Sequence, residues 1–234
     1  SKSVARTLLA KIYAEKPLRD YTKVIQYCDE VKADGFDLVD DFSDLFGMNA
    51  AGTDAKMRNT KESILEAQFT SGAGNWCTWM FGRDLVNWNN NFTWAKWVTP
   101  SRDLISAFKQ EGDEVRFKES IVYYDCNWSN YYPSDNYPFM YKCRSANSSI
   151  IKYRYADVLL MRAEALIQLN DGRIGEAIDL INELRNRASQ STTMIANYPS
   201  TYGVTFYVKP YTGTYTKDEA LKMLKFERRV ELAM

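Results

Sequence analysis

The sequence contains no histidine among its 234 residues, and this absence excludes several kinds of functional site. Histidine is the usual general base, a member of Ser-His-Asp triads and a frequent ligand of zinc. The four cysteines supply no CxxC metal or redox motif either. Cys28 falls on the apolar face of an expected helix and is interpreted as a buried thiol. Cys126 and Cys143 flank a tyrosine-rich loop, where an oxidising compartment would allow a disulfide; the sequence leaves this open.

Net charge, long apolar runs and catalytic motifs are missing as well. The 30 basic and 30 acidic residues balance, so nothing favours nucleic acid or an anionic membrane as a partner. No run of about 18 apolar residues occurs, so no membrane-spanning helix is expected. No nucleophile elbow, phosphate loop or dinucleotide fingerprint is present, and Asp113 and Glu114 on a strand would point to opposite faces. We therefore expect a protein that is not an enzyme and that uses no cofactor and no metal.

The two ends of the sequence carry no targeting signal. Residues 1–6 open directly into a helical pattern and are neither a signal peptide nor a lipid-attachment sequence. The last helical pattern stops at Met234 without a cap or a glycine. We expect either a cytosolic protein or a piece of a longer chain, and the uncapped last helix favours the second.

Apolar residues repeat at helical spacing in two similar pairs of segments. Residues 4–14 and 21–35 form the first pair, and residues 153–166 and 174–188 form the second, after a short Asn170-Asp171-Gly172 break. Helix-turn-helix units of about 34 residues are typical of tetratricopeptide-type repeats. The spacing predicts a mainly α fold, an α-α superhelix in which each tight turn makes the two helices antiparallel.

A long insertion with little periodicity separates the two repeats. We expect short strands at 64–69 and 115–124, a helix at 102–110 capped by Ser101, and irregular chain at 71–98 and 125–149. A final helix follows the capping box of Thr216 and Glu219. The predicted organisation is one domain, residues 1–234, with a helical repeat at 1–46, an aromatic loop-rich insertion at 47–149, a second repeat at 150–188, and a loop and final helix at 189–234.

Aromatic residues are abundant and locally concentrated, with 16 Tyr, 11 Phe and 6 Trp. Sugar rings stack their C–H faces on indole and phenol rings, while sugar hydroxyls need amide, carboxylate and guanidinium partners. The non-periodic stretch at residues 71–98 combines these groups, and binding residues are often found on such loops. The alternative is that several of the tryptophans only pack the loop onto the scaffold. The predicted glycan-binding residues are Trp76, Trp79, Trp88, Trp94, Arg83, Asp84, Asn87, Asn89 and Asn90.

Two further clusters invite a functional interpretation. Tyr131, Tyr132 and Tyr137 form a second aromatic cluster, which is either a ligand surface or a packed loop. Asp34, Asp37, Asp40, Asp41 and Asp44 supply oxygen ligands for calcium, but their spacing does not fit the twelve-residue calcium loop, so a solvated acidic turn is favoured. Ion pairs between the second repeat and the final helix are expected from Glu164, Arg185, Arg187, Glu227, Arg228 and Arg229.

Four stretches, in order along the chain, resemble the SusD/RagB-like family of outer-membrane glycan- or nutrient-binding lipoproteins. The helical stretches are Ala10–Tyr13 with Asp20–Ile25 and Gly35–Leu38; Tyr153–Leu166 with Ala177, Ile178, Asn182, Leu184, Arg185, Arg187 and Ala188; and the terminal Glu227–Ala233. The fourth, Pro100–Phe108 followed by Asp113 and Arg116, resembles the family's inserted helix and its acidic-basic pair. Members of this family are typically about twice as long, so the resemblance implies a fragment lacking both family termini.

The resemblance implies a lipid-anchored protein on the extracellular face of the outer membrane. Such a protein binds oligosaccharide without catalysis and passes it to a TonB-dependent, SusC-like transporter, with sugar contacts made by loops that include the insertion. A tetratricopeptide-type adaptor is the alternative, in which a partner protein binds along the helical groove. The glycan is not identified by the resemblance.

Overall fold

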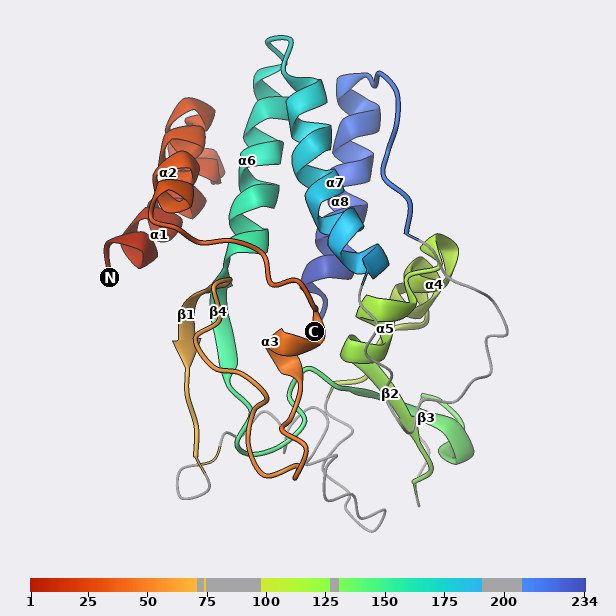
Figure 1. Ribbon diagram of the computed structural model, residues 1–234. Coiled ribbons are helices and arrows are strands. Elements are labelled where there is room, and N and C mark those ends of the chain that lie inside the picture. Colours follow the sequence, from red (N-terminus) through yellow and green to blue (C-terminus); the bar gives the residue numbers. More distant parts are fainter. Residues whose placement is uncertain (71–73, 75–97, 127–130, 191–207) are drawn as a thin grey trace.

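Figure 1 shows the computed structural model of the chain, which describes residues 1–70, 74, 98–126, 131–190 and 208–234. The longer helices stand side by side in one half of the molecule, and the short strands and helices occupy the other half. The predicted mainly α fold is confirmed. The longer helices are α1 (Lys2–Ala14), α2 (Tyr21–Ala33), α6 (Tyr155–Leu169), α7 (Ile174–Gln190) and α8 (Lys217–Leu232).

Helix α6 is the centre of the helical half and packs against α1, α2, α7 and α8. A helix surrounded on most sides must be apolar around most of its circumference, and α6 is. Its alanines Ala156, Ala163 and Ala165 are fully buried, as their small size and the predicted close approach of the helices require. The largest apolar core of the chain is built around this helix.

The two predicted helical pairs are present as α1 with α2 and α6 with α7 (Figure 1). Asp20 caps α2 as predicted, since its carboxylate accepts a hydrogen bond from the Lys23 amide at 3.1 Å. Asn170 ends α6 in the left-handed conformation (φ 52°), and Gly172 follows with φ 94°. Most residues avoid these positive φ angles, because their Cβ atom clashes with the backbone. Glycine has no Cβ and asparagine tolerates the left-handed region, so the Asn-Asp-Gly sequence suits this tight turn.

The other half of the molecule contains α3 (Ser43–Phe46), α4 (Arg102–Glu111), α5 (Glu114–Ser120) and two small antiparallel sheets. Strand β1 (Ser63–Ala67) pairs with β4 (Ile150–Arg154), and β2 (Ile121–Tyr124) pairs with β3 (Tyr137–Met140). Short 3-10 turns cover Lys16–Leu18 and Ser134–Asn136. Because β4 runs directly into α6, the β1–β4 pair ties this half to the central helix (Figure 1).

Three local predictions are wrong. Residues 115–120 belong to helix α5 rather than to a strand, because the Asp113 carboxylate caps this turn and accepts from the Arg116 amide at 3.1 Å. Residues 137–140 are a strand rather than irregular chain, because β2 supplies a distant partner that local sequence does not reveal. Tyr153 and Arg154 close strand β4, so the helix predicted from residue 153 begins at Tyr155.

Candidate functional site

An aromatic patch with one accessible ring lies on the half of the molecule that carries the short strands. We define this tyrosine patch as Arg102, Tyr131, Tyr132 and Tyr137. Arg102 is the first residue of α4, whereas the tyrosines come from the loop before β3 and from β3 itself. Tyr131 is 52% exposed, Tyr132 is half-buried and Tyr137 is fully buried. The patch therefore runs from the surface into the core.

The rings of the tyrosine patch are held at right angles to one another. Tyr131 and Tyr132 have centroids 5.1 Å apart with planes at 90°, and Tyr132 meets Tyr137 at 5.8 Å and 81°. Such edge-to-face contacts are the favoured geometry for aromatic pairs. Hydrogen bonds fix the inner two rings, from the Tyr132 hydroxyl to the Pro100 carbonyl (2.8 Å) and between the Thr99 and Tyr137 hydroxyls (2.9 Å). The outer ring of Tyr131 thus stands on a rigid base.

Arg102 places a cation over this outer ring. Its guanidinium carbon lies 4.4 Å from the Tyr131 centroid and 5.4 Å from that of Tyr132, within the range of a cation–π contact. Its Nη2 donates to the Tyr131 carbonyl at 3.0 Å. No carboxylate within the described part of the chain pairs with Arg102, which leaves guanidinium donors for a ligand. The sequence predicts Arg102 only as the first residue of a helix, a position it shares with Lys2 and Lys217, so its role beside Tyr131 carries no sequence signal.

The predicted tryptophan-rich site lies outside the described residues. This applies to Trp76, Trp79, Trp88, Trp94, Arg83, Asp84, Asn87, Asn89 and Asn90, which stay a prediction. The flanks of that stretch are described. Gly74 lies so close to Ala146 that an added Cβ would come within 2.9 Å of the alanine Cβ. At the other flank, Val98 is exposed and Thr99 and Pro100 contact the tyrosine patch, so the chain leaving the tryptophan-rich stretch leads directly to Tyr132 and Tyr137.

The tyrosine patch has the chemistry of a shallow site for a neutral polar ligand with an apolar face. Tyr131 offers a fixed aromatic surface and a hydroxyl, and Arg102 offers donors beside it. Tyr137 is inaccessible in this structure and acts as packing below the other two rings. The cluster predicted from sequence is thus brought together, with its members in different positions relative to solvent.

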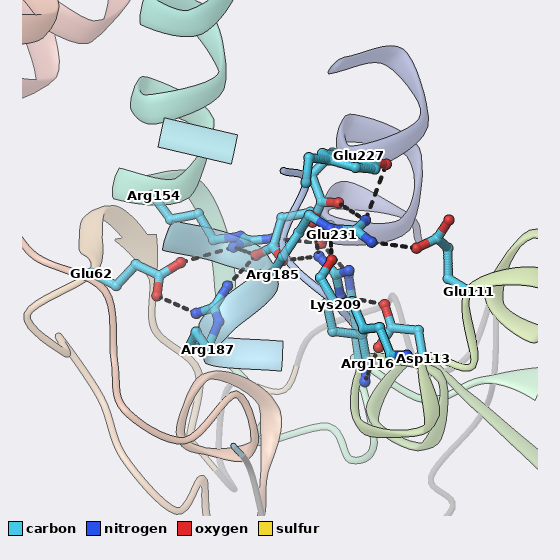
Figure 2. A network of polar contacts seen from close by, with 12 residues as sticks. Glu62, Glu111, Asp113, Arg116, Arg154, Arg185, Arg187, Lys209, Glu227 and Glu231 are labelled. Carbon is cyan, nitrogen blue, oxygen red and sulfur yellow. Dashed lines mark hydrogen bonds and ion pairs between the residues drawn. The ribbon is translucent and has the colours of Figure 1, made fainter. Parts of the chain in front are cut away.

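A second feature, the buried charge network of Figure 2, joins the two halves of the molecule. Two carboxylates of α8, one turn apart, lie at its centre and are fully buried. Glu231 pairs with Arg116 (2.9 Å), Arg154 and Arg187, while Glu227 pairs with Arg116 and with Arg185 (3.1 Å). The remaining members are Glu62, Glu111, Asp113 and Lys142.

The surrounding arginines keep the central carboxylate, Glu231, ionised despite its burial. Desolvation would raise the pKa of Glu231, but Arg187, Arg154 and Arg116 outweigh it and hold that pKa well below the ordinary range. Burial raises the pKa of Asp113 in spite of its contact with Arg116. The network holds five carboxylates and four arginines. Its lysine, Lys142, donates to the Glu231 carbonyl, and burial together with the neighbouring Arg154 lowers the pKa of this lysine well below its ordinary value. The network fixes α4, α5 and the strand pair β1–β4 to α7 and α8, and thereby positions the base of the tyrosine patch.

The predicted ion pairs between the second repeat and the final helix are present, with two exceptions: Arg229, whose partner lies on α4 in the insertion, and Glu164. Arg228 pairs with Asp157 at 2.8 Å, Arg229 pairs with Asp103, and Arg185 and Arg187 pair with the carboxylates of α8. Glu164 forms no ion pair with any described residue. The partners Glu62, Arg154 and Glu231 were missed, because an arginine or glutamate in a sequence does not indicate which distant charge it meets.

The acidic segment considered for calcium is held by protein cations. Asp34 pairs with Arg6 at 2.6 Å, and Asp44 pairs with Lys56 at 2.5 Å. Lys61 contacts Asp37 and Asp40. Asp41 accepts a hydrogen bond from the Ser43 amide at 2.9 Å. These carboxylates point to separate neighbours rather than to one common centre.

Comparisons with known proteins show similarity to one family. The SusD family model matches residues 135–234. Over 86 residues the chain is 35% identical to SusD-like protein P38 of Formosa agariphila, a match of 37% of this chain and 15% of that protein. A SusD superfamily structure from Parabacteroides distasonis is similar over 100% of this chain and 50% of its own, with 21% identity and a TM-score of 0.67. A laminarin-binding SusD-like protein has 20% identity over 100% of this chain and 52% of its own, with a TM-score of 0.64.

The chain thus spans about half the length of these solved structures, and the matched stretch is a smaller part of the curated relative. At this identity the structural matches establish the shared fold. Across the described segments, none of the helices has the length and apolar character needed to cross a bilayer.

Proposed function

We propose, from the premise that this chain is a SusD/RagB-like protein, that it takes part in non-catalytic binding of oligosaccharide at the cell surface. The single observation that supports this most directly is the geometry of Tyr131. An exposed ring is held rigidly beside a guanidinium without a carboxylate partner in the described structure. Rigid aromatic surfaces with a few polar groups are typical of binding sites that pay little conformational entropy on ligand association.

The tyrosine patch forms one wall of the proposed site, and the residues predicted from the tryptophan-rich stretch, which lie outside the described structure, are proposed as further ligand contacts. Thr99 and Pro100 connect the two, because they follow that stretch in sequence and contact Tyr137 and Tyr132. Trp88 is the preferred tryptophan, since it lies in a run of asparagines. The laminarin-binding neighbour supports a glycan as the ligand, and laminarin is the first probe to use.

Delivery of the bound glycan to a TonB-dependent, SusC-like transporter is part of the same proposal. So is attachment to the extracellular face of the outer membrane through a lipid anchor. Both follow from the family to which the chain is similar. Transporter delivery and membrane attachment are properties of a full-length protein, and this chain matches only part of the length of its relatives.

The test is a titration with laminarin oligosaccharide followed by intrinsic tryptophan fluorescence. We expect saturable quenching that Trp88→Ala abolishes or reduces. Tyr131→Ala should weaken the affinity about two- to tenfold, because one aromatic contact contributes about 0.5–1.5 kcal/mol beyond its buried area. No reducing sugar should be released during the titration.

Tyr21→Ala is the matched control. Tyr21 also carries an arginine near its ring, with Arg19 at 5.7 Å from the centroid, but it lies on α2 in the helical half. Laminarin affinity should not change in this variant. Equal weakening by Tyr21→Ala and Tyr131→Ala, or the absence of quenching by laminarin and by other neutral glycans, would contradict the proposal.

A further inference from the structure

A recess of about 230 Å³ lies between α2, α6 and α7, in the helical half of the molecule (Figure 1). Its apolar walls include Val158, Leu159 and Leu180, which are almost completely buried. Its polar lining consists of Asp29 and Lys32 from α2, Tyr155 and Arg162 from α6, and Glu176, Asp179 and Glu183 from α7. The recess thus combines an apolar interior with a charged rim.

The charges of this rim do not cancel. Arg162 is occupied, because its Nε meets Asp29 at 2.7 Å and its Nη1 meets Glu176 at 2.6 Å. Asp179 and Glu183 form no ion pair or side-chain hydrogen bond with any described residue, and Lys32 forms none either. With four carboxylates against two cations, the lining carries a net charge of −2.

Tyr155 adds a buried polar group without a partner. Its side chain is 3% exposed and lines the recess, yet no described residue forms a hydrogen bond with its hydroxyl. The hydroxyl of this almost completely buried residue is open to a ligand in the recess that supplies a donor. Burial raises the pKa of this phenol to about 12, with a contribution from the Glu183 carboxylate, so the oxygen is a neutral acceptor at pH 7.

We propose that this recess binds the lysine side chain of a partner polypeptide. The methylene stem would lie along Val158, Leu159 and Leu180, and the ammonium would meet Asp179, Glu183 and the Tyr155 hydroxyl oxygen. Three donors on one compact cation match three acceptors. The size agrees, because small-molecule pockets begin at about 300 Å³ and this smaller volume suits one side chain.

Partial burial within the recess also raises the pKa of Glu183, against the opposing effect of Lys32. A bound cation offsets the free-energy cost of burying a charged carboxylate, so the charge distribution of the recess favours binding of a cation. Lys32 is the competing cation of the chain itself. Removing it should therefore strengthen binding of an external lysine.

The experiment is an NMR titration of methyl-labelled chain with Nα-acetyl-lysine methylamide. We expect saturable shifts of the Val158, Leu159 and Leu180 methyl signals. The norleucine counterpart, which has the stem without the ammonium, should bind at least about fivefold more weakly. Asp179→Asn and Glu183→Gln should each weaken lysine binding about two- to fivefold, as expected for a partly exposed ion pair. Lys32→Met should strengthen it.

Asp218→Asn is the control for charge alone, because Asp218 is exposed on α8 and does not line the recess. Lysine affinity should be unchanged in this variant. Equal shifts with the norleucine probe, or equal weakening by Asp218→Asn and Glu183→Gln, would overturn the proposal. Tighter binding of the arginine counterpart would overturn the choice of lysine.

Discussion

Replacing Arg116 by methionine removes the cation that three buried carboxylates share, and should strongly destabilise the fold. Arg116 is fully buried and pairs through Nε with Asp113 at 2.6 Å and through Nη1 with Glu227 and with Glu231. Methionine has a similar length and fits an apolar site, so the main loss is electrostatic rather than a cavity.

The size of the effect follows from what each carboxylate retains. Glu231 keeps Arg154 and Arg187, and Glu227 keeps Arg185. Among the described residues, Asp113 keeps only the amide of residue 116 as a donor. One of three carboxylates therefore becomes a buried charge without a cation, and breaking one buried pair in this way costs about 3–5 kcal/mol. Adding Asp113→Asn removes that charge and should restore part of the loss.

Urea unfolding at pH 7, followed by far-UV circular dichroism, measures the change in the free energy of unfolding. Arg173→Met is the matched control, because Arg173 pairs with Asp171 at 2.7 Å on the surface, where such a pair contributes about 0–1 kcal/mol. A loss in Arg116→Met no larger than that in Arg173→Met would refute this view of the network. So would a double variant, with Asp113→Asn, that is less stable than Arg116→Met alone.

Two further predictions concern stability. Thr216→Ala removes the hydroxyl of the capping box with Glu219 and should lower the free energy of unfolding by about 1 kcal/mol, measured by the same urea titration. Stability should also fall as the pH is lowered below about 4.5, the ordinary value for Glu231, and continue to fall through its depressed folded-state pKa, because the unfolded chain takes up that proton first. The raised pKa of Asp113 acts in the opposite direction. Glu231→Gln removes the carboxylate whose protonation lowers stability, and it should therefore flatten the profile of urea midpoints between pH 7 and pH 3. An unchanged slope would contradict the assignment to Glu231.

Features set by neighbours in the sequence could be predicted, and those set by distant partners could not. The cap at Asp20, the turn at Asn170 and the capping box at Thr216 depend on residues within a few positions, and all three are present. The apolar periodicity of residues 153–166 predicted a helix there for the same reason. Strand β3 and the pairing of Arg154 with Glu62 and Glu231 depend on residues far away in sequence, for which a single sequence carries no signal.

The candidate site shows the same division. The composition of the loop predicted a cluster of Tyr131, Tyr132 and Tyr137. The spacing of these residues did not indicate that Tyr137 would be buried while Tyr131 is exposed to solvent. That difference arises from β3, which carries Tyr137 inward against Phe139 at 5.3 Å. Arg102 could be expected only as a helix start, and its place over Tyr131 required the fold.

The position of Glu227 and Glu231 near the end of the sequence has a consequence for synthesis. Arg116, Arg154, Arg185 and Arg187 all leave the ribosome before Glu227 and Glu231, the two carboxylates of α8 with which they pair. Before α8 is made, these four arginines have three carboxylate partners, Glu62, Glu111 and Asp113, so positive charge is in excess and its burial is unfavourable. The two halves of the molecule can therefore dock only as a late event, and a chain stalled before residue 227 should remain open and depend on chaperones.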